Sequence, residues 1–459
     1  MSEIFEKNSL PAEGPLVAWY GDDFTGSSAV AEVLTFAGLP SVLFLETPTA
    51  EQLARFRDRR GIGIAGVARA HGPQWMEREL PAVFEALASL GAPITHYKVC
   101  STLDSAPQIG SIGKAIDIGR SILDSAWTPV VIAAPAIARY QVFGNLFAIV
   151  DGIPHRLDRH PTMSRHPVTP MNEADVRRHL QRQTEQPLGL IDILALHTGN
   201  AGTFLDKEMA AGRQIVVLDV IDDETLRAAG ALVWERRGEG IFAVGSQGLE
   251  YALAAHWRDI GLIPADPPPP QGARSSRVVA ASGSCSPVTD SQLQWAAEHD
   301  FSIVDVDASK AVDPAIWEKE IARAASLAAG LIGKGRDPIM ATARGPDDPA
   351  ISKASETAMR AGVDTEVLSA RIGDGLGRMV DTVLRQTGTG RALISGGDSS
   401  GYAAKALGIF ALEAIAPLAP GAALFRARSD EPSRDGLELT LKGGQMGDRD
   451  FFGRVRNGK

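Results

Sequence analysis

The chain has 459 residues, of which 46 are Lys or Arg and 56 are Asp or Glu, so its formal net charge is −10. A surface this acidic has no general attraction for nucleic acid or anionic lipid, so we expect neither as a partner. Two cysteines are too few for a disulfide framework, and the sequence shows neither a basic-then-apolar leader nor an apolar run of about 20 residues, so we expect a cytoplasmic protein without membrane contact.

A run of four prolines at residues 267–270 is the clearest break in the sequence. Proline cannot continue a helix or sit in a central strand, and consecutive prolines favour a stiff, extended segment. We therefore predict an N-terminal domain of residues 1–265, a linker of residues 266–272 and a C-terminal domain of residues 273–459.

Short apolar segments alternate with amphipathic segments before the proline run. Near-continuous apolar strands separated by helices are typical of a parallel sheet that is covered on both faces. The predicted strands are residues 16–20, 41–45, 61–67, 94–99, 129–134, 191–196, 214–220 and 240–246. The predicted helices include residues 27–36, 75–90 and 224–236.

The same alternation continues after the proline run. The predicted strands are residues 277–282, 301–307, 338–343, 392–397 and 437–441, and the long helices are residues 313–332 and 364–385. We therefore predict an α/β protein made of two α/β domains, with largely parallel sheets that face each other across a cleft. Ligands of such sheets bind beyond the carboxyl ends of the strands, so the residues that follow each strand are the candidates for function.

The first candidate is the segment GDDFTGSS, which follows the first predicted strand and enters a helix near Gly26. It holds two carboxylates, Asp22 and Asp23, and three hydroxyls, including that of Thr25. A helix N-terminus can hold an anionic ligand, and an aspartate at a strand end can accept a proton from a substrate hydroxyl. One of these side chains could instead serve only as a helix cap. Five polar side chains in one turn exceed what a cap requires, which favours a functional role.

The second candidate is the segment KVCSTLDS, which begins at Lys98 and also follows a predicted strand. Its cation, the hydroxyls of Ser101 and Thr102 and the carboxylate of Asp104 suit a small polar anion. Cys100 could be read as a nucleophile, but a lone cysteine at an apolar strand end is more often a small buried side chain.

The stretch of residues 155–171 contains three histidines, three arginines and several prolines. The prolines predict a loop, and no pair of its histidines has the spacing of metal ligands on a helix. Two alternatives are a structural metal site and a substrate-side loop whose side chains bind an anion.

Three Gly-rich or Ser-rich turns follow predicted strands in the second half, in the segments ASGSCSP, SGGDSSG and LKGGQMG. Glycines let the backbone approach a ligand closely, and free N–H groups at a helix start can hold phosphate oxygens. One such turn would be weak support, but three at strand ends in one domain favour a phosphate or nucleotide site. The sequence contains no GxxxxGK[ST], dinucleotide-binding, HExxH or GxSxG pattern.

These motifs, in this order and spacing, resemble the four-carbon acid sugar kinases, whose members include threonate, erythronate and 3-oxo-tetronate kinases. The resemblance covers about residues 16–452 and includes the segments SGSCSPVTDSQ, SGGDSSGYAAKALGI and LKGGQMGDRDFF. It implies that the N-terminal domain binds the sugar acid and the C-terminal domain binds ATP, with Mg²⁺, while the linker lets the two domains close.

The resemblance also implies roles for individual residues. On the sugar-acid side, one of Asp22 and Asp23 would be the catalytic base, and Lys98 would face the substrate or the transferring phosphate. The remaining side chains of the substrate site would be Thr25, Ser101, Thr102 and Asp104. The nucleotide site would be lined by Ser282, Ser284, Gly396, Gly397, Asp398, Ser399, Gly443 and Gly444.

We therefore expect an enzyme that uses ATP to phosphorylate a hydroxyl of a small, four-carbon sugar acid. One alternative is a non-catalytic sensor that binds the sugar acid and the nucleotide. Another is a nicotinamide-dependent dehydrogenase, which rests on the α/β pattern alone and lacks the dinucleotide-binding fingerprint. Because symmetric dimers are the commonest assembly of soluble enzymes, a homodimer is the expected oligomer.

Overall fold

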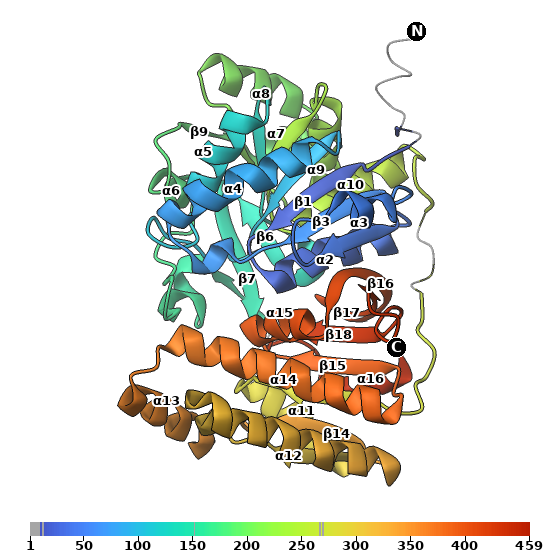
Figure 1. The fold of residues 1–459 in the computed structure, drawn as a ribbon. Helices are drawn as coiled ribbons and strands as arrows, with labels where there is room; N and C mark the ends of the chain where they lie inside the picture. The colour runs from blue at the N-terminus through green and yellow to red at the C-terminus, as the bar shows by residue number, and fades with distance from the viewer. Residues whose placement is uncertain (1–9, 12, 151, 266–267, 269) are drawn as a thin grey trace. The chain divides into compact units, whose positions relative to one another are not determined.

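The computed structural model describes residues 10–11, 13–150, 152–265, 268 and 270–459. The chain divides into two compact units, Met1–Pro267 and Pro268–Lys459. Asp266, Pro267 and Pro269 of the predicted linker lie outside the described residues. Each unit has a largely parallel sheet with helices packed on it, which confirms the predicted α/β class (Figure 1).

The N-terminal unit is built on a parallel sheet whose described strands follow the order β2-β3-β1-β4-β11-β5-β10-β9. The strands are β1 (Val17–Gly21), β2 (Ser41–Phe44), β3 (Gly61–Ala65), β4 (Ile94–Lys98), β5 (Thr128–Val131), β9 (Leu188–Ile191), β10 (Ile215–Leu218) and β11 (Ile241–Gly245). Residue Gly21, the last of β1, pairs with Lys98, the last of β4. The two strands therefore end at the same level.

Helices cover both faces of this sheet, and each face has its own apolar core. The first face carries α2 (Phe24–Phe36), α7 (Ile193–His197), α8 (Ala201–Ala210), α9 (Asp223–Glu235) and α10 (Gly248–Asp259). The second carries α4 (Pro73–Ala88), α5 (Ile112–Ile122) and α6 (Val176–Gln181), while the short α3 (Ala50–Ala54) contributes no buried residue. The chain thus turns to one face after β1 and to the opposite face after β4. Adjacent strands whose connections diverge in this way leave a crevice at their carboxyl ends.

Two parts of this unit differ from the prediction. Residues 191–196 were predicted as a strand, but the strand ends at Ile191 and α7 begins at Ile193. The cause is Asp192, whose carboxylate accepts a hydrogen bond from the Ala195 N–H and caps the helix. A small antiparallel sheet, which was not predicted, comprises β6 (Arg139–Val142), β7 (Asn145–Val150) and β8 (Ile153–Arg156). The stretch 155–171, predicted as a loop, begins inside β8 and continues in short 3₁₀ turns.

The C-terminal unit has a mixed sheet whose described strands follow the order β13-β14-β12-β15-β18-β17-β16. The strands are β12 (Val279–Ser282), β13 (Phe301–Asp305), β14 (Asp337–Ala341), β15 (Arg391–Ser395), β16 (Ile409–Ala419), β17 (Ala422–Ser429) and β18 (Glu438–Lys442). All but β16 and β17 are parallel, and these two form an antiparallel hairpin that was not predicted.

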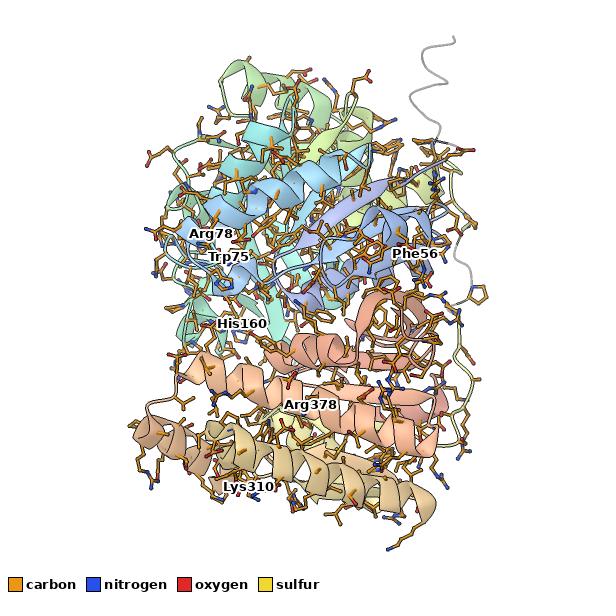
Figure 2. All side chains as sticks on the ribbon, viewed as in Figure 1. Phe56, Trp75, Arg78, His160, Lys310 and Arg378 are labelled. Carbon is orange, nitrogen blue, oxygen red and sulfur yellow. The ribbon has the colours of Figure 1, made fainter. Side chains whose placement is uncertain are left out.

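Helices pack on this second sheet as well. Helices α11 (Pro287–Glu298) and α16 (Phe451–Asn457) share one apolar core with the strands. The remaining helices are α12 (Pro314–Gly333), α13 (Pro349–Ala361), α14 (Thr365–Thr387) and α15 (Gly397–Ala406). Figure 1 shows α12 and α14 side by side, and Arg378 of α14, labelled in Figure 2, donates two hydrogen bonds of 2.6 Å to Glu318 of α12. The side chains of residues 397–400 lie outside the described part of the chain.

The packing of α9 on α10 leads to a stability prediction. A Cβ atom at Gly230 would lie 1.9 Å from the carbonyl oxygen of Ala252, whereas a Cβ at Gly330 of α12 would meet no atom within 4 Å. We expect Gly230→Ala to lower the free energy of unfolding by about 1–3 kcal/mol through overpacking against backbone. The matched control Gly330→Ala should raise it by about 0.5–1 kcal/mol through helix propensity. Urea denaturation measures both, and equal effects of the two substitutions would contradict the close approach.

Candidate functional site

The carboxyl edge of the first sheet holds a cluster of one arginine and two aspartates. The Arg69 guanidinium lies beyond β3 and contacts Asp22 Oδ1 at 2.5 Å, Asp22 Oδ2 at 3.2 Å and Asp23 Oδ1 at 2.7 Å. The backbone N–H of Asp22 also donates to the carbonyl of Lys98, which ties the cluster to β4. The structure therefore brings Asp22, Asp23 and Lys98 together, and it adds Arg69, which the sequence analysis missed. No motif marks Arg69, because it lies alone in a short 3₁₀ turn.

The two aspartates of this cluster have different surroundings. The Asp22 side chain is 1% exposed, and burial raises its pKa, while the charge of Arg69 acts in the opposite direction. The Asp23 side chain is 27% exposed and caps α2, since its Oδ1 accepts the Gly26 N–H at 2.9 Å. Among the described residues, Asp23 Oδ2 has no hydrogen-bond partner. Asp22 is thus an internal partner of Arg69, whereas Asp23 keeps one oxygen available to a ligand.

The Lys98 ammonium lies beside this cluster. It is buried, donates to the carbonyl of Val99 at 2.8 Å, and would lie 2.7 Å from a Cβ placed at Gly26. Within the described part of the chain, no carboxylate lies within ion-pair distance of its Nζ. A buried cation without a counter-ion, next to a helix N-terminus, favours the binding of an anion.

The rest of the KVCSTLDS segment is divided between this edge and another contact. The Cys100 thiol lies 3.0 Å from the Thr102 hydroxyl, and Cys100 is only partly buried, unlike the predicted buried side chain. Asp104, predicted to bind substrate, accepts a hydrogen bond from Thr169, whose hydroxyl also lies 2.9 Å from His166 Nδ1. Asp104 therefore connects this segment to the stretch 155–171.

The predicted side chains Thr25 and Ser101 are partly buried at the same edge, and the Thr25 carbonyl accepts a hydrogen bond from Ser28. Among the described residues, no group of three His, Cys, Asp or Glu side chains is arranged to hold a metal ion.

In the second unit, three neighbouring strand ends form a row of polar side chains. Ser282 of β12 pairs in register with Ser395 of β15, which pairs with Lys442 of β18. The hydroxyl oxygens of Ser282 and Ser395 are buried without a hydrogen-bond partner. Unpartnered buried hydroxyls are costly unless a ligand or water completes their hydrogen bonds. The row is therefore a site suited to a polar ligand.

Lys442 is the strongest charge in this row, and the sequence analysis missed it. The residue is fully buried, and its Nζ donates to the carbonyl of Gly443 at 3.2 Å and to the Thr289 hydroxyl at 3.4 Å. No described carboxylate pairs with it, and burial lowers the pKa of Lys442 to about 8. The available signal was a lysine at the end of a strand and directly before two glycines, but the prediction rested on the glycines alone.

The three Gly-rich or Ser-rich turns meet at this row. Gly444, in the third turn, approaches the first turn so closely that a Cβ there would lie 2.5 Å from Ser284 Oγ, and the Gly444 carbonyl accepts a hydrogen bond from Ser286. The Gly396 N–H, at a φ of 148°, donates to the carbonyl of Lys442. The predicted residues Ser282, Ser284, Gly396, Gly443 and Gly444 are therefore neighbours. Gly397 begins α15, and the side chains of Asp398 and Ser399 lie outside the described residues.

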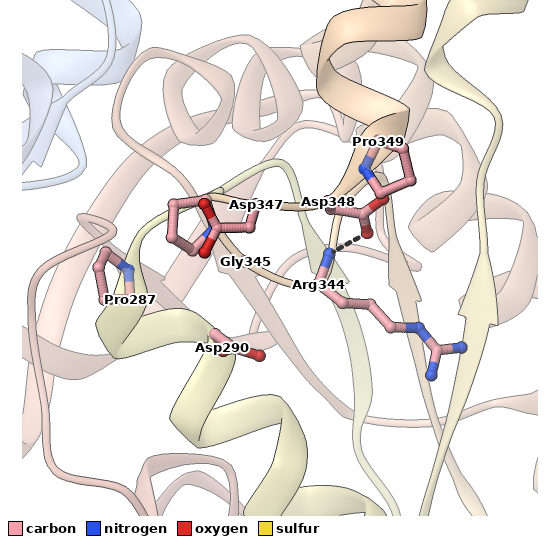
Figure 3. Close-up of a pocket in the computed structure, with 8 residues that line it drawn as sticks. Pro287, Asp290, Arg344, Gly345, Asp347, Asp348 and Pro349 are labelled. Carbon is pink, nitrogen blue, oxygen red and sulfur yellow. Dashed lines mark hydrogen bonds between the residues drawn. The ribbon is translucent and has the colours of Figure 1, made fainter.

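A surface hollow of about 510 Å³ lies at the first turn of α11, which begins at Pro287 (Figure 3). Its lining includes Asp290, Asp347 and Asp348, and the Asp348 carboxylate accepts a hydrogen bond from the backbone N–H of Arg344. Three carboxylates repel a triphosphate, so phosphates suit the Lys442 row better than this hollow.

Comparisons with known proteins agree with the division of the chain. A sugar-binding N-terminal domain family matches residues 17–253, and a nucleotide-binding C-terminal domain family matches residues 279–452. A 3-oxo-isoapionate kinase of Paraburkholderia graminis is 50% identical over 97% of this chain and 95% of its own length. A 3-oxo-tetronate kinase of Methylobacterium radiotolerans is 30% identical over 95% of this chain and 97% of its own length.

A solved structure from Salmonella typhimurium LT2, described as a tRNA synthase, shares the fold with a TM-score of 0.76 and 24% identity, over 95% of this chain and 98% of that one. No helix in the described part of the chain is long and apolar enough to cross a membrane. The named relatives are kinases, so the alternative of a non-catalytic sensor is not favoured. The chain belongs to the four-carbon acid sugar kinase family and is an ATP-dependent phosphotransferase that acts on an alcohol group.

Proposed function

We propose that this kinase phosphorylates a hydroxyl of a 3-oxo sugar acid, with 3-oxo-isoapionate as the first candidate and 3-oxo-tetronate as the second. The support is the 50% identity to a 3-oxo-isoapionate kinase and the 3-oxo acid named for the other relative. The observation that carries the reaction type is the buried Lys442, which has no carboxylate partner among the described residues and adjoins two buried serine hydroxyls that lack hydrogen-bond partners there.

On the nucleotide side, we assign the phosphates of ATP to the Lys442 row. The ammonium supplies a positive charge, and Ser282 and Ser395 supply hydroxyl hydrogen bonds. Mg²⁺ is commonly held by phosphates and only one or two carboxylates, which fits a chain whose described residues show no three-ligand metal site. Bound with ATP, Mg²⁺ would supply further charge neutralisation for the phosphates.

On the acid side, we assign Asp23 as the catalytic base. Its Oδ1 is fixed by Arg69 and by the Gly26 N–H, so its free Oδ2 can accept the proton of the substrate hydroxyl. Asp22 is a positioning residue, because it holds Arg69 from the buried side. Lys98, with Ser101 and Thr102, would bind the hydroxyls of the acid and face the transferring phosphate.

The substrate assignment is tested by measuring ADP release with a coupled assay over a panel of sugar acids. The panel holds 3-oxo-isoapionate, 3-oxo-tetronate, threonate and erythronate, each with MgATP. We expect turnover with the 3-oxo acids and the highest kcat/KM with 3-oxo-isoapionate. Binding of ATP without ADP release for any 3-oxo acid would contradict the proposal, and preference for threonate would correct the substrate class.

The two aspartates should respond differently to amide substitution. We expect Asp23→Asn to lower kcat by about 10²–10⁴-fold with little change in KM, because a proton acceptor is lost while the size of the side chain is kept. Asp22→Asn should mainly lower stability, by about 3–5 kcal/mol, because it leaves Arg69 with one carboxylate. Steady-state kinetics and thermal unfolding distinguish the two effects. Asp58→Asn, at an exposed position, is the control. Full turnover of Asp23→Asn would show that the base is another group.

Lys442→Met should separate stability from nucleotide affinity. Burial lowers the pKa of Lys442 from the 10.5 of an exposed lysine to about 8, so at pH 7 holding the side chain as a cation costs the folded chain about 3 kcal/mol. Methionine of similar volume should stabilise the ligand-free protein at pH 7 by up to that amount. Between pH 8 and pH 10.5, Lys442 loses its proton in the folded chain but keeps it in the unfolded chain. The cost of burying the charge therefore disappears over this range, and the stability advantage of Lys442→Met should shrink with it.

The same substitution should weaken ATP binding by about 10–100-fold, since a charged hydrogen bond is lost. In the unsubstituted protein, ATP affinity should fall as pH rises above about 8, because Lys442 then loses its charge. Calorimetry from pH 7 to pH 9.5 measures this. Lys319→Met, an exposed position on α12, should change neither property. Unaltered ATP affinity of Lys442→Met would remove Lys442 from the nucleotide site.

A further inference from the structure

Arg139 is a cation in the first unit that none of the roles above uses. It follows β5 after a 3₁₀ turn, Pro135–Ile137, and the left-handed residue Ala138. Within the described residues, its guanidinium donates to the carbonyls of Ile137 and Ala138 alone, at 3.1 and 3.2 Å. Its Nε is buried without a hydrogen-bond partner. No described carboxylate lies within ion-pair distance of Arg139.

Several other arginines of the first unit form ion pairs with carboxylates. Arg69, Arg156, Arg177 and Arg213 each contact an aspartate or a glutamate. A half-buried guanidinium that lacks such a partner is costly, and burial lowers the pKa of Arg139. An anionic ligand would remove this cost, because it would give the Nε–H an acceptor and the charge a counter-ion.

The position of Arg139 places it at the same edge of the sheet as the candidate base. Gly245 of β11 pairs with Lys98 on one side and with Val131 of β5 on the other, so the carboxyl ends of β4 and β5 are separated by a single strand. The thiol of Cys100 lies within electrostatic range of both Arg69 and Arg139. Arg139, which follows β5, therefore lies at the same edge of the sheet as Lys98, with a single strand between β5 and β4.

His160, in the stretch 155–171, is a neighbour of Arg139 that carries no negative charge. His160, labelled in Figure 2, is buried, and its pKa is lowered by burial and then by the charge of Arg139. Its Nδ1 accepts the N–H groups of Thr162 and Met163, so its proton resides on Nε2. Among the described residues, His160 thus adds no negative charge beside Arg139, and no carboxylate forms an ion pair with it.

We propose that Arg139 binds the carboxylate of the sugar acid and thereby selects acids over neutral sugars. This inference rests on the proposed function. A guanidinium presents two parallel N–H groups that match the two oxygens of a carboxylate, whereas the compact ammonium of Lys98 suits a hydroxyl or a phosphoryl oxygen. The acid is then held at one end by Arg139, while the hydroxyl to be phosphorylated lies at Asp23.

The test compares Arg139→Gln and Arg139→Lys with a matched control, Arg120→Gln. Arg120 is also half-buried, but it bonds Gln186, Thr128 and Gln214 near the opposite, amino end of β5. For each variant, kcat and KM are measured with the 3-oxo acid that the unsubstituted enzyme prefers, with the carboxamide of that acid, and with ATP.

We expect Arg139→Gln to raise KM for the acid by about 10–100-fold, with kcat/KM for the carboxamide changed less than about threefold and KM for ATP unchanged. Arg139→Lys should restore part of the preference for the acid, and Arg120→Gln should leave it intact. Thermal unfolding of each variant accompanies the kinetics. If Arg139→Gln does not fold, the inference is tested with Arg139→Lys through the ratio of kcat/KM for the acid to kcat/KM for the carboxamide. We expect the lysine to reduce this ratio by several-fold, because a point charge replaces the two parallel N–H groups.

An unchanged KM for the acid would overturn the inference and leave the proposed function standing. Equal losses for the acid and the carboxamide would also overturn it, since they indicate a structural role. A rise confined to KM for ATP, or a fall in kcat alone, would assign Arg139 to the transferring phosphate instead. Absence of turnover by the unsubstituted enzyme with every 3-oxo acid would overturn the proposed function, and this inference with it.

Discussion

In the described part of the chain, each candidate site holds a buried lysine that has no carboxylate within ion-pair distance. In the second unit Lys442 ends a strand in an apolar setting, and in the first unit Lys98 is buried beside the N-terminus of α2. A protein that holds such groups gives up stability, because a charge removed from water must be compensated by something. Here the compensation is left to the ligand. The contrast is Arg69, whose charge is matched by Asp22 and Asp23 inside the fold.

The order of the parallel strands brings these side chains together. Residues that end neighbouring parallel strands lie at one level, so Ser282, Ser395 and Lys442 form a row although more than a hundred residues separate the first two. In the first sheet, the chain leaves β1 and β4 toward opposite faces, which opens the edge where Asp23 and Lys98 lie. The glycine at 444 then lets one turn of the second unit approach Ser284, where any side chain would collide.

Much of the fold could be predicted because buried parallel strands have a simple pattern. Largely apolar runs such as those of β1, β4 and β15 predict strands directly, and Pro287 lies at the start of α11. The β16–β17 hairpin was missed because it is rich in alanine and contains Pro417, neither of which favours a strand; packing on neighbouring strands overrides both preferences. The 191–196 error arose from the helix cap at Asp192, a local hydrogen bond that an apolar pattern does not reveal.

The sequence predicted which segments contribute to the candidate site, but not how those segments contact one another. The motifs indicated which turns matter, but the contact between Gly444 and Ser284 and the bridge from Arg69 to both aspartates join residues whose proximity depends on strand order. The segment 155–171 illustrates a further consequence. Thr169 and His166 attach it to Asp104, outside the regular strands and helices of the sheet. Substitutions in this segment would leave the strands that hold the reacting groups in place. Related kinases could therefore differ in the sugar acid that they prefer while they keep the same phosphoryl transfer.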